Sequence, residues 1–209
     1  KQKKIKKEKN IIFVGRLNYA KGYDVFKDAV IKILNNFPKW KAYSLGDEDR
    51  RNIYINHSNH HELGFVNHKK TLNILNKSEI AVVPSRWEEP FGRTSLEATS
   101  SGCATIISNR GGLKETTDSA IVLKNLNSNE LYIEIKKLIT NNKKRKIIQS
   151  LSRKNVKHLI SENTKIIDQI RESCVPFYNI SLIKKKLKII NLYNQGQKLN
   201  HRLYNISLG

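Results

Sequence analysis

Short apolar runs alternate along the chain with segments whose apolar residues recur at helical spacing. Residues 11–14 are apolar throughout, which is typical of a strand covered on both faces. Similar runs, each closed by Gly, Pro or polar residues, predict strands at 41–45, 53–55, 62–66, 80–83, 104–107 and 120–123. Residues 57–61 are expected to form the loop between the third and fourth of these strands.

Between the strands, apolar residues spaced three or four apart predict amphipathic helices. The first carries a stripe from Val25 to Phe37 and ends before Pro38. Further helices are predicted around 72–75, 93–101, 131–139, 147–156 and 166–170. Alternation of strand and helix indicates a doubly wound, Rossmann-like α/β fold with a parallel sheet, followed by a helical C-terminal extension.

Composition limits the compartment and the class of protein. The 209 residues are 38% hydrophobic and the apolar ones are grouped in runs, which argues against a disordered chain. The length suits one α/β domain with an extension. Two cysteines are too few for a disulfide framework, so we expect a cytoplasmic protein. No apolar stretch approaches the roughly 20 residues of a membrane span. The chain contains no methionine, and we therefore expect it to be a piece of a longer polypeptide.

The formal net charge is +21, with dense basic runs at 1–9, 143–146 and 184–188. Lysine occurs together with abundant Ile and Asn, the mixture that an AT-rich coding sequence produces whatever the function. Aromatic residues are not interleaved with the basic runs as nucleic-acid stacking would require, so no nucleic-acid partner is expected. A solvated surface and peripheral contact with an anionic membrane at its inner face stay open as alternatives.

The loop after the first strand reads GRLNYAKG and spans residues 15–22. Gly15 and Gly22 permit a tight path, while Arg16 and Lys21 place two cations beside the positive end of the following helix. Such a loop suits a diphosphate. The alternative is two solvated cations in a surface loop.

The loop after 80–83 contains two carboxylates separated by seven residues. Pro90 and Gly92 force a turn that opens a helix, so that Glu89 precedes the helix and Glu97 lies about one turn inside it. Free backbone N–H groups at 91–94 can bind phosphate or sugar oxygens. Alternatively, Glu89 caps the helix and Glu97 is solvated.

Three further features are weaker. Gly111 and Gly112 follow the strand at 104–107 and could close over a ligand, or could simply begin a helix. The histidines at 57, 60 and 61 have no Cys or Asp partner at ligand spacing, so we expect no metal site. Cys103 has no paired histidine and is expected to be a small buried residue.

Together, these loops resemble the donor domain of the retaining glycosyltransferases of family 4, which have the GT-B fold. The resemblance extends over residues 11–178 and rests on GRLNYAKG and on EPFGRTSLE, a Glu-x7-Glu signature. Two departures, Ala104 and Lys114 where the family often has Pro, affect only loop geometry. The resemblance implies a nucleotide-diphosphate sugar as donor substrate, transfer with retention, and no cofactor or metal.

The resemblance also implies roles. Arg16 and Lys21 would hold the donor diphosphate, and Glu89 would contact the sugar near its anomeric centre. Glu97 would bind the ribose. The remaining donor-binding residues would be Gly15, Phe91, Gly92, Arg93 and Thr94 around the phosphates and sugar, with Gly46, Phe65 and Val66 near the base.

Domain organisation follows from the same resemblance. Residues 1–10 would be a basic lead-in from a missing N-terminal acceptor domain, 11–160 the donor domain and 161–178 a returning helix. Residues 179–209 would be a linker and the start of a second GT-B domain, because 187–192 is another strand-like run. Three alternatives stay open: a non-catalytic nucleotide-sugar-binding module, a nucleotide-sugar epimerase, and a basic nucleic-acid-binding protein.

Overall fold

The computed structural model describes residues 6–49 and 52–174, without the side chains of 154–164, 172 and 174. The chain divides into two compact units, Lys1–Leu159 and Ile160–Gly209. The predicted linker and second-domain strand at 179–209 lie outside the described residues, as does the end of the predicted returning helix.

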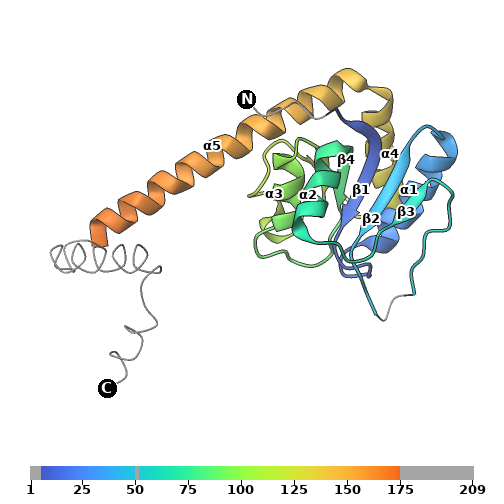
Figure 1. The fold of residues 1–209 in the computed structure, drawn as a ribbon, viewed down its shortest axis with the longest axis horizontal. Helices are drawn as coiled ribbons and strands as arrows, with labels where there is room; N and C mark the ends of the chain where they lie inside the picture. The colour runs from blue at the N-terminus through green and yellow to red at the C-terminus, as the bar shows by residue number, and fades with distance from the viewer. Residues whose placement is uncertain (1–5, 50–51, 175–209) are drawn as a thin grey trace, which may run out of the picture. The chain divides into compact units, whose positions relative to one another are not determined.

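The first unit is built on a six-stranded sheet in which every neighbouring pair is parallel. The strands are β1 (Glu8–Val14), β2 (Lys41–Leu45), β3 (His60–Glu62), β4 (Ser78–Val83), β5 (Ala104–Ile107) and β6 (Ile121–Val122). Their order, β3-β2-β1-β4-β5-β6, is that of a doubly wound Rossmann sheet. Figure 1 labels four neighbours of this order, β3, β2, β1 and β4. The predicted fold class is therefore confirmed.

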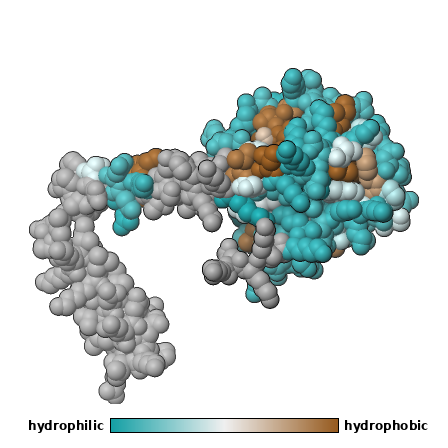
Figure 2. Space-filling view, turned by 90° about the horizontal axis from the view of Figure 1, so that it is seen from above, coloured by the Kyte–Doolittle hydropathy of each residue, from teal (hydrophilic) through white to brown (hydrophobic). Residues whose placement is uncertain are grey.

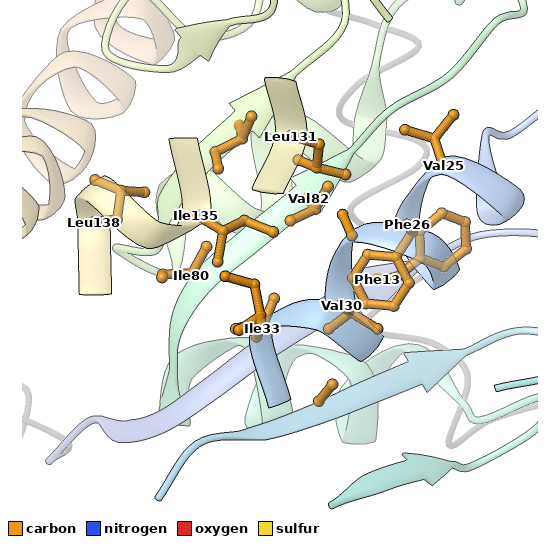
Figure 3. Close-up of a cluster of buried hydrophobic side chains, with 14 of the residues drawn as sticks. Phe13, Val25, Phe26, Val30, Ile33, Ile80, Val82, Leu131, Ile135 and Leu138 are labelled. Atoms are coloured by element: carbon orange, nitrogen blue, oxygen red, sulfur yellow. The ribbon is translucent and has the colours of Figure 1, made fainter. Parts of the chain in front are cut away.

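Helices cover both faces of the sheet. Successive residues of a strand point to opposite sides, and the apolar residues on each side pack against helices. Ile11 and Phe13 of β1 join the cluster formed with α1 (Tyr23–Asn36) and α4 (Ser128–Thr140), as Figure 3 shows for Phe13. Ile12 joins instead the cluster formed with α2 (His68–Lys77) and α3 (Arg93–Ser100). Each fully buried Ile or Phe contributes about 1.5–3 kcal/mol, so this packing orders the loops that follow the strands.

The edge strand β3 differs from the prediction. No strand forms at 53–55, whose Ile53 and Ile55 pack against the core from an irregular segment. The strand lies at His60–Glu62 rather than 62–66, within what was expected to be mainly a loop. Ser44 of β2 accounts for part of this, since its Oγ lies 2.8 Å from Nε2 of His60. A polar edge strand lacks the apolar pattern on which the prediction relied.

The two helices predicted around 147–156 and 166–170 are one helix, α5 (Asn142–Cys174). The sequence contains no Gly or Pro between these bounds, so backbone hydrogen bonding continues where the apolar pattern lapses. Asn141 caps its start by accepting a hydrogen bond from the backbone N–H of Lys144.

The amino edge of the sheet is the side on which the parallel strands begin, and the carboxyl edge is the side on which they end. Lys7 lies at the amino edge, just before β1. Its ammonium donates to the carbonyl oxygens of Leu75 (3.3 Å), Ser78 (2.6 Å) and Ser101 (3.0 Å). Cys103 is fully buried beside it, as expected, and burial raises the pKa of its thiol to about 11. This edge is therefore closed by protein groups.

The surface seen in Figure 2 is mostly hydrophilic, with separate hydrophobic areas. Several large apolar side chains are exposed on loops at the carboxyl edge of the sheet, namely Tyr19, Phe65, Trp87 and Phe91. Within the described residues, no helix combines the length and hydropathy needed to cross a bilayer.

Candidate functional site

The sheet reverses its strand order between β1 and β4, and ligands of such sheets bind beyond the carboxyl ends of the strands at this point. Two hollows lie there. A cavity of about 40 Å³ is lined by residues of the loops at 15–22 and 84–94. A cleft of about 390 Å³ is lined by the ends of β1 and β2 and by the loop before α2. Val14 and Gly15 line both hollows.

Lys21 and Glu89 meet at the small cavity. Lys21 Nζ lies 2.5 Å from Glu89 Oε1, and Ser85 Oγ donates to the same oxygen at 2.9 Å. Glu89 is 17% exposed, so its carboxylate is screened from solvent more than a typical surface acid. The structure therefore brings together the two motifs predicted to carry the chemistry, and does so through opposite charges.

Two glycines allow the loops to approach one another. Gly46 has φ +138°, and a Cβ there would lie 1.9 Å from the carbonyl oxygen of Gly15. Gly22 has φ +70°, and its Cβ would lie 1.8 Å from the carbonyl oxygen of Pro84. Any side chain at either position would drive the backbones apart, so these contacts require glycine.

The segment at 109–113, which contains the short 3-10 helix η1 (Gly111–Leu113), supports the Glu88–Glu89 segment. The backbone N–H of Gly111 donates to Glu88 Oε2 (2.5 Å), and that of Gly112 donates to the carbonyl oxygen of Glu89 (2.7 Å). Arg110 lies 3.0 Å from Glu88 Oε1. The Gly-Gly loop thus braces the carboxylate loop in this structure.

Helix α3 begins beside the cavity with Gly92 at its N-cap and no side-chain cap. Glu89 does not cap the helix, so that alternative is wrong. Among the described residues, the backbone N–H groups of Arg93 and Thr94 make no hydrogen bond, and Thr94 lines the cavity. Unpaired N–H groups at a helix N-terminus favour an anion.

Glu97 lies inside α3, where its side chain is 21% exposed. Its Oε1 lies 3.1 Å from Nε2 of His68 on α2 and 3.6 Å from the guanidinium of Arg93. Glu97 is therefore neither fully solvated nor in direct contact with Lys21. His68 was not predicted, because no sequence spacing links α2 to α3.

Four further predicted residues line the larger cleft, and Glu97 does not. Arg16, Gly46, Phe65 and Val66 line it, together with Asp47 and Thr71. Phe65 is 82% exposed, so its ring is available to a planar ligand. Arg16 and Lys21, expected at one diphosphate, line different hollows, and Gly15 lines both of them. A ligand that contacts both must extend past Gly15.

The predicted residues Phe91 and Arg93 are exposed at the start of α3, and neither lines the two hollows. Prediction also missed Ser85 and Phe13, which line the small cavity. Ser85 stands four residues before Glu89 and could have been suspected from that spacing.

The histidines of the β2–β3 region have protein partners. His57 lies 3.2 Å from Asn35 Oδ1, and His60 contacts Ser44. Burial lowers the pKa of His60 from its ordinary 6.5. In the part of the chain that the structure describes, no group of three or more His, Cys, Asp or Glu side chains is arranged to hold a metal ion.

The sequence profile of the glycosyl transferases group 1 family matches residues 1–161. The chain belongs to this family. Spore coat protein SA of Bacillus subtilis is 28% identical over 166 residues, covering 70% of this chain and 44% of that protein. An uncharacterized glycosyltransferase of Methanocaldococcus jannaschii is 36% identical over 115 residues, covering 52% of this chain and 29% of that protein. The group 1 chain thus spans less than half the length of these relatives.

Solved structures agree with this assignment of the fold. HepE of Anabaena in complex with UDP-glucose has a TM-score of 0.65 at 19% identity, covering 79% of this chain and 49% of that chain. The C-terminal domain of a group 1 protein (LpcC) from Francisella tularensis also has a TM-score of 0.65, at 22% identity, covering 73% and 87%. This member of the glycosyl transferases group 1 family therefore has the fold of a GT-B C-terminal domain.

Proposed function

We propose that this chain binds the nucleotide-diphosphate sugar of a retaining, metal-independent hexosyltransferase of family 4. The observation that carries the proposal is the Lys21–Glu89 pair at a cavity that adjoins, at Gly15, a larger cleft. The cleft volume, about 390 Å³, falls in the range of small-molecule sites, about 300–1,000 Å³. A nucleoside in the cleft would place the diphosphate beside Gly15 and the sugar next to the Lys21–Glu89 pair.

Entry of the donor would exchange the partner of Lys21. A partly exposed ion pair contributes little to stability, so replacing the Glu89 carboxylate by a phosphate oxygen costs little. Glu89 would then be free to accept hydrogen bonds from the sugar near its anomeric carbon. Lys21, together with Arg16, would stabilise the negative charge that develops on the departing diphosphate, the part that a divalent ion plays in other enzymes.

Glu97 would accept hydrogen bonds from the ribose hydroxyls, and the N–H groups of Arg93 and Thr94 would bind phosphate or sugar oxygens. Phe65 and Val66 would face the base. HepE of Anabaena was solved with UDP-glucose, which makes UDP the first nucleotide to test.

The proposal extends to the parent protein. The acceptor would be held by an N-terminal domain, in a cytoplasmic enzyme whose basic surface contacts an anionic membrane.

Calorimetric titration with UDP and GDP in the presence of EDTA tests the donor site. One nucleotide should bind the wild-type chain, and Arg16→Ala and Glu97→Ala should each weaken binding at least about tenfold, as expected for loss of a charge-assisted contact. Glu134→Ala, on α4 away from the site, is the matched control. Absence of binding by the wild-type chain would overturn the proposal. Retention is tested on the full-length parent by the anomeric configuration of its product.

A further inference from the structure

Arg86 and Asp24 form an ion pair that the proposed donor contacts do not use. Arg86 donates from both terminal nitrogens to the Asp24 carboxylate, at 2.6 and 2.7 Å. Asp24 lies in the first turn of α1, just after the loop that carries Lys21. Arg86 lies three residues before Glu89. The pair therefore joins the two loops whose charges meet at the cavity.

Arg86 also holds the loop at 15–22 in other ways. Its guanidinium donates to the carbonyl oxygen of Tyr19 (2.8 Å) and lies 3.6 Å from the centre of the Tyr19 ring. The backbone N–H groups of Arg86 and Trp87 both donate to the carbonyl oxygen of Ala20, at 2.9 and 3.1 Å. The residues immediately before Lys21 are thus fixed against the segment that leads to Glu89.

We propose that Arg86 and Asp24 are positioning residues that set the place of the Lys21 ammonium relative to Glu89, and hence to the second phosphate of the donor. The inference rests on the proposed function. The backbone beside Lys21, held by the contacts at Tyr19 and Ala20, sets the region that its four-carbon side chain can reach. A planar guanidinium bound through two nitrogens to a helix-anchored carboxylate supplies that fixed point.

The pair is better suited to positioning than to stabilising the fold. Its side chains are 24% and 30% exposed, so solvent screens the pair in part and its contribution to stability is small beside that of the buried core. The hydrophobic clusters on both faces of the sheet hold the fold without it. Its loss should therefore change the loop and leave the domain folded.

The test compares UDP with UMP, which lacks the second phosphate; GDP and GMP replace them if GDP is the nucleotide that the wild-type chain binds. Calorimetry is carried out on the wild-type chain, Arg86→Gln, Lys21→Ala and the double variant. We expect Arg86→Gln to weaken diphosphate binding about tenfold and to leave monophosphate binding unchanged. In the Lys21→Ala background, Arg86→Gln should weaken diphosphate binding less than about twofold further. Both changes remove the same contact, the one between the Lys21 ammonium and the second phosphate.

Arg86→Lys keeps the charge without the two-nitrogen geometry and should resemble Arg86→Gln. Lys137→Gln, which breaks an ion pair on α4, should bind like the wild type. Hydrogen exchange gives a readout that needs no nucleotide. The backbone amides of residues 86 and 87 should exchange faster in Arg86→Gln than in the wild type, while the amides of β4 stay protected.

The outcomes are distinct. A wild-type chain that binds neither nucleotide overturns the proposed function and this inference with it. A wild type that binds, with an unchanged diphosphate-to-monophosphate ratio in Arg86→Gln, overturns only the inference. Equal effects of Arg86→Gln with and without Lys21, or unchanged amide exchange, also contradict it.

Discussion

Two lysines at opposite edges of the same sheet have opposite surroundings. Lys7, at the amino edge, is surrounded by protein carbonyls at the ends of α2 and α3. Lys21, at the carboxyl edge, meets one carboxylate at a cavity that continues into an open cleft. The first ammonium is satisfied by the fold itself, whereas the second has a partner that a ligand can replace.

The difference follows from the direction of a parallel sheet. Each helix runs back against the strands, so its carbonyl end reaches the amino edge and its N–H end reaches the carboxyl edge. A cation at the amino edge therefore donates hydrogen bonds to the free carbonyl oxygens at the helix ends. A cation at the carboxyl edge lies among N–H groups and glycine loops, where an anion is favoured.

The largest expected effect is on the reactivity of the Cys103 thiol, which lies beside Lys7 at the amino edge. Because burial raises the pKa of Cys103 from 9.0 to about 11, its thiolate fraction at neutral pH falls about a hundredfold, before access is considered. Alkylation of the folded chain, mapped by mass spectrometry to the Cys103 peptide, should therefore be more than about a hundredfold slower than in urea. Rapid labelling of folded protein would mean that this edge opens and that the comparison is wrong.

Lys7→Met should lower the free energy of unfolding by about 3 kcal/mol, because it keeps the side-chain stem but leaves carbonyl oxygens without a donor. Urea denaturation measures this change. Lys9→Met, at an exposed position of β1, is the control and should change stability little. Equal stability of the two variants would remove the structural role assigned to Lys7.

Lys21→Ala should do the reverse, weakening binding of the nucleoside diphosphate about thirtyfold, or about 2 kcal/mol, with little change in the unfolding midpoint. Lys77→Ala, at an exposed site near the amino edge, should bind like the wild type. If Lys21→Ala destabilised the fold as much as Lys7→Met, the two edges would not differ as described.

The smallest effect concerns His60 on β3, where burial lowers the pKa although the Glu62 carboxylate acts against it. The unfolded chain then binds more protons than the folded chain as pH falls below about 6.5, so stability is lost on acidification. Thermal unfolding between pH 7.5 and 5.5 should show this slope, and His60→Gln should reduce it. An unchanged slope would place the acid sensitivity elsewhere.

The sequence predicted the central strands well because they are continuous apolar runs. The strands at 41–45 and 104–107 have the predicted bounds, and the structure places the GRLNYAKG and Glu-x7-Glu loops at one edge. The sequence alone could not predict β3, whose polar residues form a strand only by pairing with β2. The continuity of α5 was also not predictable, because the residues between its two apolar stripes favour a helix without showing a periodic apolar pattern.

Within the candidate site, spacing indicated Lys21 and Glu89 because each follows a buried strand. Spacing gave no indication of Arg86 with Asp24, or of His68 with Glu97, because these pairs join elements far apart in the chain. Such contacts depend on how α1, α2 and α3 pack on the sheet.

By itself, the sequence determined the alternation of strands and helices and the residue types that follow each strand, because both depend on local pattern and backbone chemistry. Among the described residues, the tertiary structure decided which lysines complete the fold and which face a cavity. The physical reason is that a charge acquires its role from its surroundings. Carbonyl oxygens surround Lys7, a carboxylate beside a cavity meets Lys21, and only the packing of the helices on the sheet brings those groups to them.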